Sequence, residues 1–492
     1  TYGRGHFSAV FDPTPKHTAG FDIEYTERST HMPTLSRTTL GQTQSDSRYR
    51  QHMDGNTLTA TANYIWKIDT LGSQFKLIAD YTRYTSDGDN SYHTTTCAPG
   101  TLRDSLYESA TGSVYDILTA DAGLTRKLPH GLTLRAGLRY TRNDMADKSR
   151  YAAQTQGTWL ALPEYSYDQH YTEQIGAAYA SLEYSAGRWE LSAGLRGEYT
   201  SVASQAFGRS YFGLFPNVSV SRALNALRTW LLVAQWSRNI ERPAFPALNP
   251  ARIRISDYSW QSGNPSLRPT YIHRFSLTAV WKYRYTLTVG GNLHHDLIRE
   301  IAHRDATAPD AVYIRPENHY TENHWFVAAS VPAKITRWWN LSVNAVGVMQ
   351  RIRLNSTDSP ATHYLMFADA TCSFTLPAGF FAEAVYRAQS RLYSGNSEVG
   401  PRHTLSATVK KQLFGKRLTL FCTLSNITGC DWEFASLTDG MRRTIDTGQA
   451  WSGRLWKVGA AWNFRTGKKF RARTVESAAE TQRKRLVKST EQ

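Results

Sequence analysis

The chain has 492 residues, a formal net charge of +16 and a mean hydropathy of −0.48. It contains no apolar run of about 20 residues, which excludes a membrane-spanning helix. Its four cysteines form no Cys-x-x-Cys pair, which excludes the common zinc and thiol-redox motifs.

Segments that alternate apolar and polar side chains run along nearly the whole chain. Leu132, Leu134 and Ala136, for example, alternate with Thr133 and Arg135. Because successive side chains of a strand point to opposite faces, each segment has one apolar and one polar face. We predict about 19 such strands from this pattern. In chain order their centres lie near Ala9, Ile23, Asn63, Ala79, Leu118, Ala136, Tyr179, Ala193, Val218, Ala234, Leu277, Leu287, Ala329, Asn344, Phe374, Ala384, Ala407, Leu420 and Ala460.

Short turns alternate with long polar stretches between these strands. The short turns, most of which carry Gly, Pro, Asp or Ser, are predicted at 13–16, 70–73, 128–131, 185–188, 223–227, 377–379 and 414–416, and near Tyr283 and Arg337. The long loops are predicted over 27–56, 86–113, 142–170, 239–270, 296–323 and 427–450. This alternation is typical of a transmembrane β-barrel, whose short turns face the periplasm and whose long loops face outside. An aromatic content of 12% suits the girdles at the two membrane interfaces.

The sequence therefore predicts an all-β fold, a large antiparallel transmembrane β-barrel over residues 1–464. The last strand, which ends at Phe464, must run toward the periplasm, and counting back makes the first strand run the same way. An even-stranded barrel then requires at least one strand before the first, so we expect a processed, truncated or partial chain. Residues 465–492 are basic and hold few large apolar side chains, which predicts a disordered or weakly helical periplasmic tail.

Charged residues recur at the polar positions of the predicted strands. A charge on the lipid face at mid-depth costs about 2–4 kcal/mol, so these residues must face the lumen or lie near an interface. There they could solvate a pore or hold a plug. They also account for the basic net charge better than a nucleic-acid role does. The predicted lumen-facing charges are Lys67, Arg135, Arg139, Glu190, Arg196, Glu198, Arg274, Lys282 and Arg284.

Motifs for catalysis or metal binding are weak. There is no Gly-x-Ser-x-Gly, Walker or His-Glu-x-x-His motif, so we predict no enzyme, no catalytic residue and no cofactor. The run from His294 to Asp296 is more readily a polar rim than a metal site. Residues 87–90 have near-calcium spacing but lack the distal Glu, which favours a plain loop tip. Cys422 and Cys430 could form a disulfide in an oxidising compartment or remain thiols.

The most distinctive stretch is the proline-rich segment 236–271. Its prolines fix φ and forbid helix, so we expect a stiff loop that gates, binds or covers strand edges. Its pattern Ser-Arg-x-Ile-x-Arg-Pro, Leu-Asn-Pro, Gly-Asn-Pro-x-Leu-x-Pro and Tyr resembles the outer-membrane β-barrel proteins of Bacteroidota akin to TonB-dependent receptors. The run 424–427 adds to the resemblance. Its signature residues are Arg238, Arg242, Pro243, Leu248, Asn249, Pro250, Gly263, Asn264, Pro265, Leu267, Pro269 and Tyr271.

The resemblance implies a full-length barrel of 22 strands in the bacterial outer membrane, with a plug domain and a TonB box that this sequence lacks. It implies import of a glycan, peptide or metal chelate. The implied partners are outer-membrane lipid, a TonB complex for a full-length parent with a plug, and a surface lipoprotein as an optional lid, with no nucleic acid. One alternative is a plug-less surface adhesin or interaction barrel without transport. A soluble all-β binding protein is the other, and outward aromatic residues near strand ends argue against it.

Overall fold

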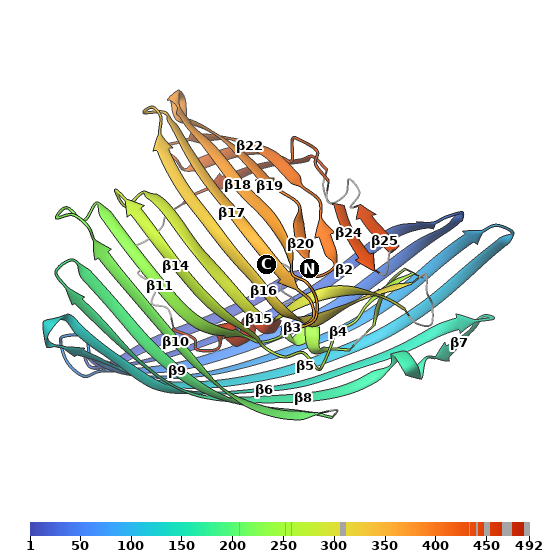
Figure 1. The fold of residues 1–492 in the computed structure, drawn as a ribbon, viewed down its shortest axis with the longest axis horizontal. Helices are drawn as coiled ribbons and strands as arrows, with labels where there is room; N and C mark the ends of the chain where they lie inside the picture. Colours follow the sequence, from blue (N-terminus) through green and yellow to red (C-terminus); the bar gives the residue numbers. More distant parts are fainter. Residues whose placement is uncertain are drawn as a thin grey trace.

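The computed structural model describes residues 1–205, 207–250, 252–256, 258–305, 311–431, 433–438, 441–446, 453–464 and 475–486. These residues form a sheet of 22 strands and a second sheet of four. The large sheet curves into a trough (Figure 1). None of the helices in these ranges is long and apolar enough to cross a membrane.

The large sheet is an antiparallel meander. Of its 22 strands, β7, β12 and β13 are short additions in the loops, which leaves 19 that each pair with the next along the chain. They are β1 (Tyr2–Thr14), β2 (His17–Leu40), β3 (Thr43–Lys67), β4 (Gln74–Ala98), β5 (Thr101–Leu128), β6 (Leu132–Thr155), β8 (Tyr167–Ala186), β9 (Trp189–Ser204), β10 (Gly208–Ala223), β11 (Trp230–Glu241), β14 (Thr270–Trp281), β15 (Tyr285–Arg304), β16 (Val312–Lys334), β17 (Trp339–Arg353), β18 (Ala361–Leu376), β19 (Phe380–Gln389), β22 (Arg402–Leu413), β23 (Leu418–Ser425) and β26 (Leu455–Trp462). Every predicted strand centre lies in one of these strands, so the predicted all-β fold is confirmed.

The remaining elements belong to the loops and the C-terminal segment. In the large sheet, β7 (Thr158–Ala161) pairs with β6, and β12 (Ile253–Ser256) pairs with β13 (Ser259–Gln261), which runs parallel to β16. The second sheet comprises β20 (Leu392–Ser394), β21 (Ser397–Val399), β24 (Glu433–Thr438) and β25 (Met441–Asp446). The short helices are η1 (Pro129–Gly131), η2 (Pro163–Tyr165), α1 (Phe245–Leu248), η3 (Pro377–Gly379), α3 (Glu480–Arg483) and η4 (Lys484–Leu486).

The predicted short turns join neighbouring strands at one end of the sheet. The turn after β5 is typical: η1 occupies it, and Gly131 has a φ of +75°. A Cβ at Gly131 would lie 2.3 Å from the Ser185 carbonyl oxygen, so this position requires glycine.

The two faces of the sheet differ as the alternation predicts. Large apolar side chains such as Leu77, Leu138 and Leu195 are exposed on the outer face, where lipid would cover them. The inner face buries polar side chains instead, including Thr61 and Asp80, whose hydroxyl and carboxylate lie 2.5 Å apart.

The predicted long loops are mostly strands. β2 and β3 continue to a turn at residues 41–42, and β4 and β5 continue to a turn at residues 99–100. The predictions of loops over 27–56 and 86–113 are therefore wrong, and so is that of a loop tip at 87–90, which lies within β4. Loss of apolar alternation marks where a strand leaves the membrane, but backbone pairing continues beyond that point in water.

Of the two alternatives predicted for the tail, residues 475–486 are helical in short turns and not disordered. They form α3 and η4 against the inner face of the sheet, where Ala479 and Arg485 are buried. Polar groups of the inner face bind this segment, which the tail's own composition could not reveal. The rest of the predicted tail, 465–474 and 487–492, lies outside the described residues.

Candidate functional site

The expectation that prolines forbid helix in the segment 236–271 is wrong for α1, because Pro246 lies in the first turn of that short helix, where a missing amide costs no hydrogen bond. The proline-rich segment folds back on itself, and we name residues 242–250 and 263–269 the signature clasp. Its two stretches are joined by backbone hydrogen bonds: the Gly263 amide donates to the Asn249 carbonyl at 3.0 Å, and the Asn264 amide donates to the Ala247 carbonyl at 2.7 Å. A Cβ at Gly263 would lie 2.1 Å from the Asn249 carbonyl oxygen. The approach of the two stretches therefore depends on the missing side chain.

Gly263→Ala is expected to destabilise the protein by about 1–3 kcal/mol, because the added methyl group must push apart two backbone segments. The measurement is urea unfolding of the folded protein in detergent micelles, followed by tryptophan fluorescence. Gly347→Ala is the matched control, since a Cβ there has no neighbour within 4 Å. Equal midpoints for the two variants would contradict the role of Gly263.

The clasp supplies a hydrophobic core to the inner face of the barrel. Leu267 is 0% exposed, and it lies in one cluster with Phe245 and Leu248. The rest of the cluster comes from the neighbouring strands: Tyr115, Ile117, Met145, Tyr171 and Val202. This burial makes the clasp part of the barrel interior rather than a loose loop at its mouth.

Beside this core, Arg242 enters a buried charge network. Its guanidinium donates to the Glu198 carboxylate at 2.7 Å and to the Thr200 hydroxyl at 2.9 Å. The Arg242 Nε lies 3.8 Å from Glu173, whose other oxygen accepts a hydrogen bond from Arg485 at 2.5 Å. The side chains of Arg242 and Glu173 are 9% and 2% exposed, so these charges neutralise one another away from bulk water.

A cavity of about 190 Å³ adjoins the network on the inner face. Its charged lining consists of Arg139, Arg196, Glu198 and Arg242, and Gln482 of α3 closes one side. Each guanidinium of the lining already faces a carboxylate: Arg139 pairs with Asp121 at 2.7 Å, and Arg196 pairs with Glu198 at 2.6 Å. Arg242 faces both Glu198 and Glu173, so the lining is polar and its charges are largely paired.

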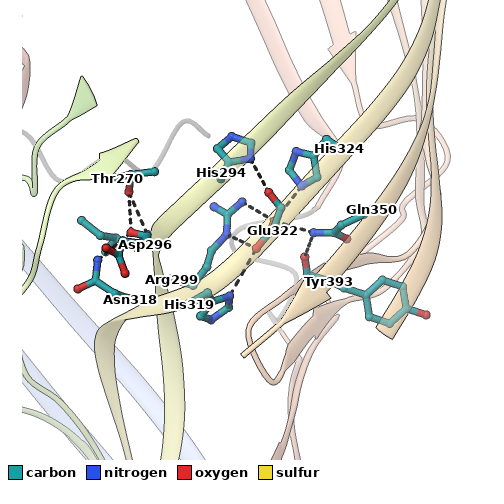
Figure 2. A network of polar contacts seen from close by, with 11 residues as sticks. Thr270, His294, Asp296, Arg299, Asn318, His319, Glu322, His324, Gln350 and Tyr393 are labelled. Carbon is teal, nitrogen blue, oxygen red and sulfur yellow. Dashed lines mark hydrogen bonds and ion pairs between the residues drawn. The ribbon is translucent and has the colours of Figure 1, made fainter. Parts of the chain in front are cut away.

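A second buried network surrounds Glu322 on β16 (Figure 2). The Glu322 side chain is 0% exposed and accepts hydrogen bonds from Arg299 at 3.0 Å and from Gln350 at 2.8 Å. His324 Nε2 lies 2.8 Å from the same carboxylate, and His319 Nδ1 lies 3.5 Å from it. One carboxylate thus joins side chains from β15, β16 and β17.

The Glu322 network also contacts the small sheet and helps to hold it in place. Gln350 donates a second hydrogen bond to the Tyr393 carbonyl on β20 at 3.1 Å (Figure 2). Asn396 adds two bonds: its side chain donates to the Ala302 carbonyl at 2.7 Å and accepts from the Ala302 amide at 2.9 Å. The small sheet is therefore fixed to the β15–β16 hairpin.

Within the small sheet, Glu398 lies between two guanidiniums, Arg442 at 2.6 Å and Arg391 at 3.2 Å. Partial burial raises the pKa of the Glu398 carboxyl. The hydrogen bonds and charges of both arginines lower that pKa by more, so the net shift is downward. The carboxylate stays charged and holds β21 to β25.

The predicted lumen-facing charges fall into three groups. Arg139, Arg196 and Glu198 meet in the cavity described above. Four others share the inner-face parity but lie more exposed along their strands: Lys67, Arg135, Glu190 and Arg274. The prediction of a strand position facing the lumen is wrong for Lys282 and Arg284, which lie in the turn between β14 and β15. Their side chains lie over the rings of Trp281 and Tyr285, respectively.

The signature residues outside the networks have structural contacts. Arg238 on β11 donates to the Leu214 carbonyl at 2.8 Å and lies over the Tyr271 ring. Pro243 accepts a bond from Arg485. Leu248, Asn249, Gly263, Asn264 and Leu267 build the clasp, and Pro250, Pro265 and Pro269 punctuate it.

Sequence reasoning missed Glu173, Glu322 and Arg485. Glu322 lies at the end of the predicted loop 296–323, and Glu173 lies just after the predicted loop 142–170, where the strand pattern begins. Arg485 lies in the predicted tail. In the described ranges, no group of three or more His, Cys, Asp or Glu residues could hold a metal ion, and the four cysteines are unpaired.

Comparisons with known proteins agree with the fold. No curated protein matches this chain. The ferric-catecholate import receptor Fiu of E. coli K12, in its closed form, is similar in structure with 10% identity, a TM-score of 0.59, and coverage of 94% of this chain and 80% of Fiu. The siderophore receptor PirA from Acinetobacter baumannii has 12% identity, a TM-score of 0.48, and coverage of 94% and 80%. PirA from Pseudomonas aeruginosa has 11% identity, a TM-score of 0.47, and coverage of 93% and 79%.

A comparison with protein-family models identifies the family of the chain. The model of the outer membrane protein beta-barrel family matches residues 66–459, from the end of β3 to β26. That range includes the clasp, the Glu322 network and every member of the Arg242 network except Arg485. It also agrees with the apolar outer face and the antiparallel meander, and it supports an outer-membrane location. The chain therefore belongs to the outer membrane protein beta-barrel family.

Proposed function

We propose that this chain is the barrel of an outer-membrane receptor that takes up a nutrient, either a glycan, a peptide or a metal chelate. The observation that carries the proposal is the signature clasp packed inside a wide, polar, charge-lined barrel interior. A barrel that only displayed surface loops would not need buried ion networks within it. The similarity in fold to the ferric-catecholate import receptor Fiu also supports a receptor role.

We further propose that the long hairpins, such as β4–β5, face the outside of the cell and that the short turns face the periplasm. Uptake depends on a TonB complex that acts on a plug domain of the full-length parent. A surface lipoprotein is an optional lid over the barrel. The source organism is a member of the Bacteroidota. These assignments rest on the family resemblance of the signature residues.

We also propose that further strands complete the barrel wall formed by residues 1–464. In the described part of the chain, β1 pairs only with β2, and β26 pairs only with β23. A sheet edge with unpaired amides and carbonyls cannot face hydrocarbon, because each unsatisfied group costs several kcal/mol. Three additional strands would bring the meander to the 22 strands that the resemblance implies.

Uptake assays in the source bacterium test the receptor role. Cells that lack the gene and cells that carry it back on a plasmid are given three labelled probes: a ferric catecholate, an oligosaccharide and an oligopeptide. We expect the deletion to reduce uptake of one probe at least tenfold, with restoration by the plasmid, and a protonophore to have the same effect. Normal uptake of all three probes, together with reduced attachment of the deletion strain to surfaces, would favour the adhesin instead.

A further inference from the structure

The described part of the C-terminal tail, residues 475–486, forms what we name the strap. At its start, a Cβ at Gly20 of β2 would lie 3.1 Å from Val475. Lys76 of β4 forms an ion pair with Glu476 at 2.6 Å. The Ala478 amide donates to the Asp80 carboxylate, also on β4, at 2.7 Å. The strap thus begins on the inner face near the end of the sheet that carries the short turns.

The other end of the strap reaches the signature clasp. Arg485 donates from Nη1 to Glu173 of β8 at 2.5 Å and from Nε to the Pro243 carbonyl at 3.0 Å. Its guanidinium also lies 4.3 Å from the centre of the Phe245 ring. One buried side chain therefore touches the barrel wall, the backbone of the clasp and the aromatic anchor of the clasp.

These contacts couple the position of the strap to the clasp. If the strap left the inner face, Glu173 would lose its shortest ion pair and would keep Asn143 and the more distant Arg242. A buried carboxylate with weakened pairing is costly, and Phe245 would lose the cation over its ring. Since coupling free energies are reciprocal, a loosened clasp must also weaken the hold on the strap.

We propose that the strap is a latch inside the barrel: when seated it locks the signature clasp to the wall, and its withdrawal loosens the clasp. The two ends of the latch lie on β4 and on α1, so a displacement at the Lys76 end is transmitted to the clasp. This device does not depend on which solute the barrel takes up. Its test therefore succeeds or fails separately from the receptor proposal.

The test measures access to the clasp in the complete chain reconstituted in lipid vesicles. Native cysteines are replaced by serine, and a single cysteine is placed at Ala247, which is half-buried against the clasp core. A hydrophilic maleimide labels this cysteine. Arg485→Ala is expected to raise the labelling rate roughly tenfold, and Arg485→Lys is expected to restore part of the protection.

Lys484→Ala is the matched control. Lys484 precedes Arg485 in the strap, its side chain is 75% exposed, and it pairs only with Glu480 in the described contacts. It should leave the labelling rate unchanged. Equal rates for Arg485→Ala and Lys484→Ala would overturn the latch.

A second measurement keeps Arg485 in place, in case its removal prevents folding. Cysteines at Lys76 and Glu476 are joined by a short bismaleimide, with Leu77 and Glu476 as the control pair, since Leu77 points to the outer face. Only the first pair should cross-link. The cross-linked strap should slow the labelling of a cysteine at Ala247 several-fold in dilute urea. Cross-linking of both pairs, or unchanged labelling after cross-linking, would contradict the proposal.

Discussion

Glu173→Ala is expected to lower the free energy of unfolding by about 3–5 kcal/mol. The Glu173 carboxylate is 2% exposed and faces two guanidiniums, those of Arg485 and Arg242. Its removal leaves Arg485 without a carboxylate partner and Arg242 with Glu198 alone. The Asn143 amide loses its acceptor at 2.8 Å and keeps only the Gln482 oxygen at 3.4 Å. The measurement is the urea midpoint of the refolded barrel in detergent micelles, followed by tryptophan fluorescence.

Glu183→Ala on the same strand is the control for this change. Glu183 pairs with Arg135 at 3.1 Å, but their side chains are 37% and 47% exposed, so water screens the pair. The loss expected there is about 0–1 kcal/mol. Similar losses for both variants would mean that the buried network contributes no more than a surface pair.

Glu322→Ala is expected to cost about 3–5 kcal/mol as well, and to detach the small sheet. The Arg299 guanidinium would lose its carboxylate, and Gln350 would lose one of the two acceptors that orient it toward Tyr393. Stability is measured as for Glu173. Detachment is measured as faster proteolysis between β19 and β22 on intact cells.

Two further variants separate the causes. Glu322→Gln keeps the size of the side chain and removes its charge, so it should retain packing but lose the pairing with Arg299. Glu317→Ala lies on the same strand in a more exposed pair with Arg315, and a loss of about 0–1 kcal/mol is expected. A Glu322→Ala protein as stable and as protease-resistant as Glu317→Ala would show that the network does not hold the small sheet.

The alternation of side chains was sufficient to predict the membrane part of the fold. Lipid selects apolar side chains on one face of each strand, such as Leu77 and Leu138, and the lumen selects polar side chains on the other. Hydrophobicity therefore repeats every two residues. That constraint ends at the membrane boundary. Beyond it, residues 27–56 are polar on both faces, yet backbone pairing keeps them in strands, so their pattern resembles that of a loop.

The site was predictable only in part, for a related reason. Arg242 and Glu198 could be singled out because a motif carried one and strand parity carried the other. Their meeting depends on how the clasp folds back onto β9, which no local pattern specifies. Arg485 had no local signal at all, because its partner Glu173 is 312 residues away in the chain.

The strap has a consequence for the order in which the protein assembles. Neighbouring strands of the meander are close in sequence, so each hairpin can form with little loop-closure entropy. The contact between Lys76 and Glu476 instead spans 400 residues. It also needs a wall that includes β2, β4, β6 and β8 and a folded clasp above it. Seating of the strap therefore follows the pairing of these strands and the folding of the clasp, and the ion pair of Arg485 marks barrels in which that part of the inner face is assembled.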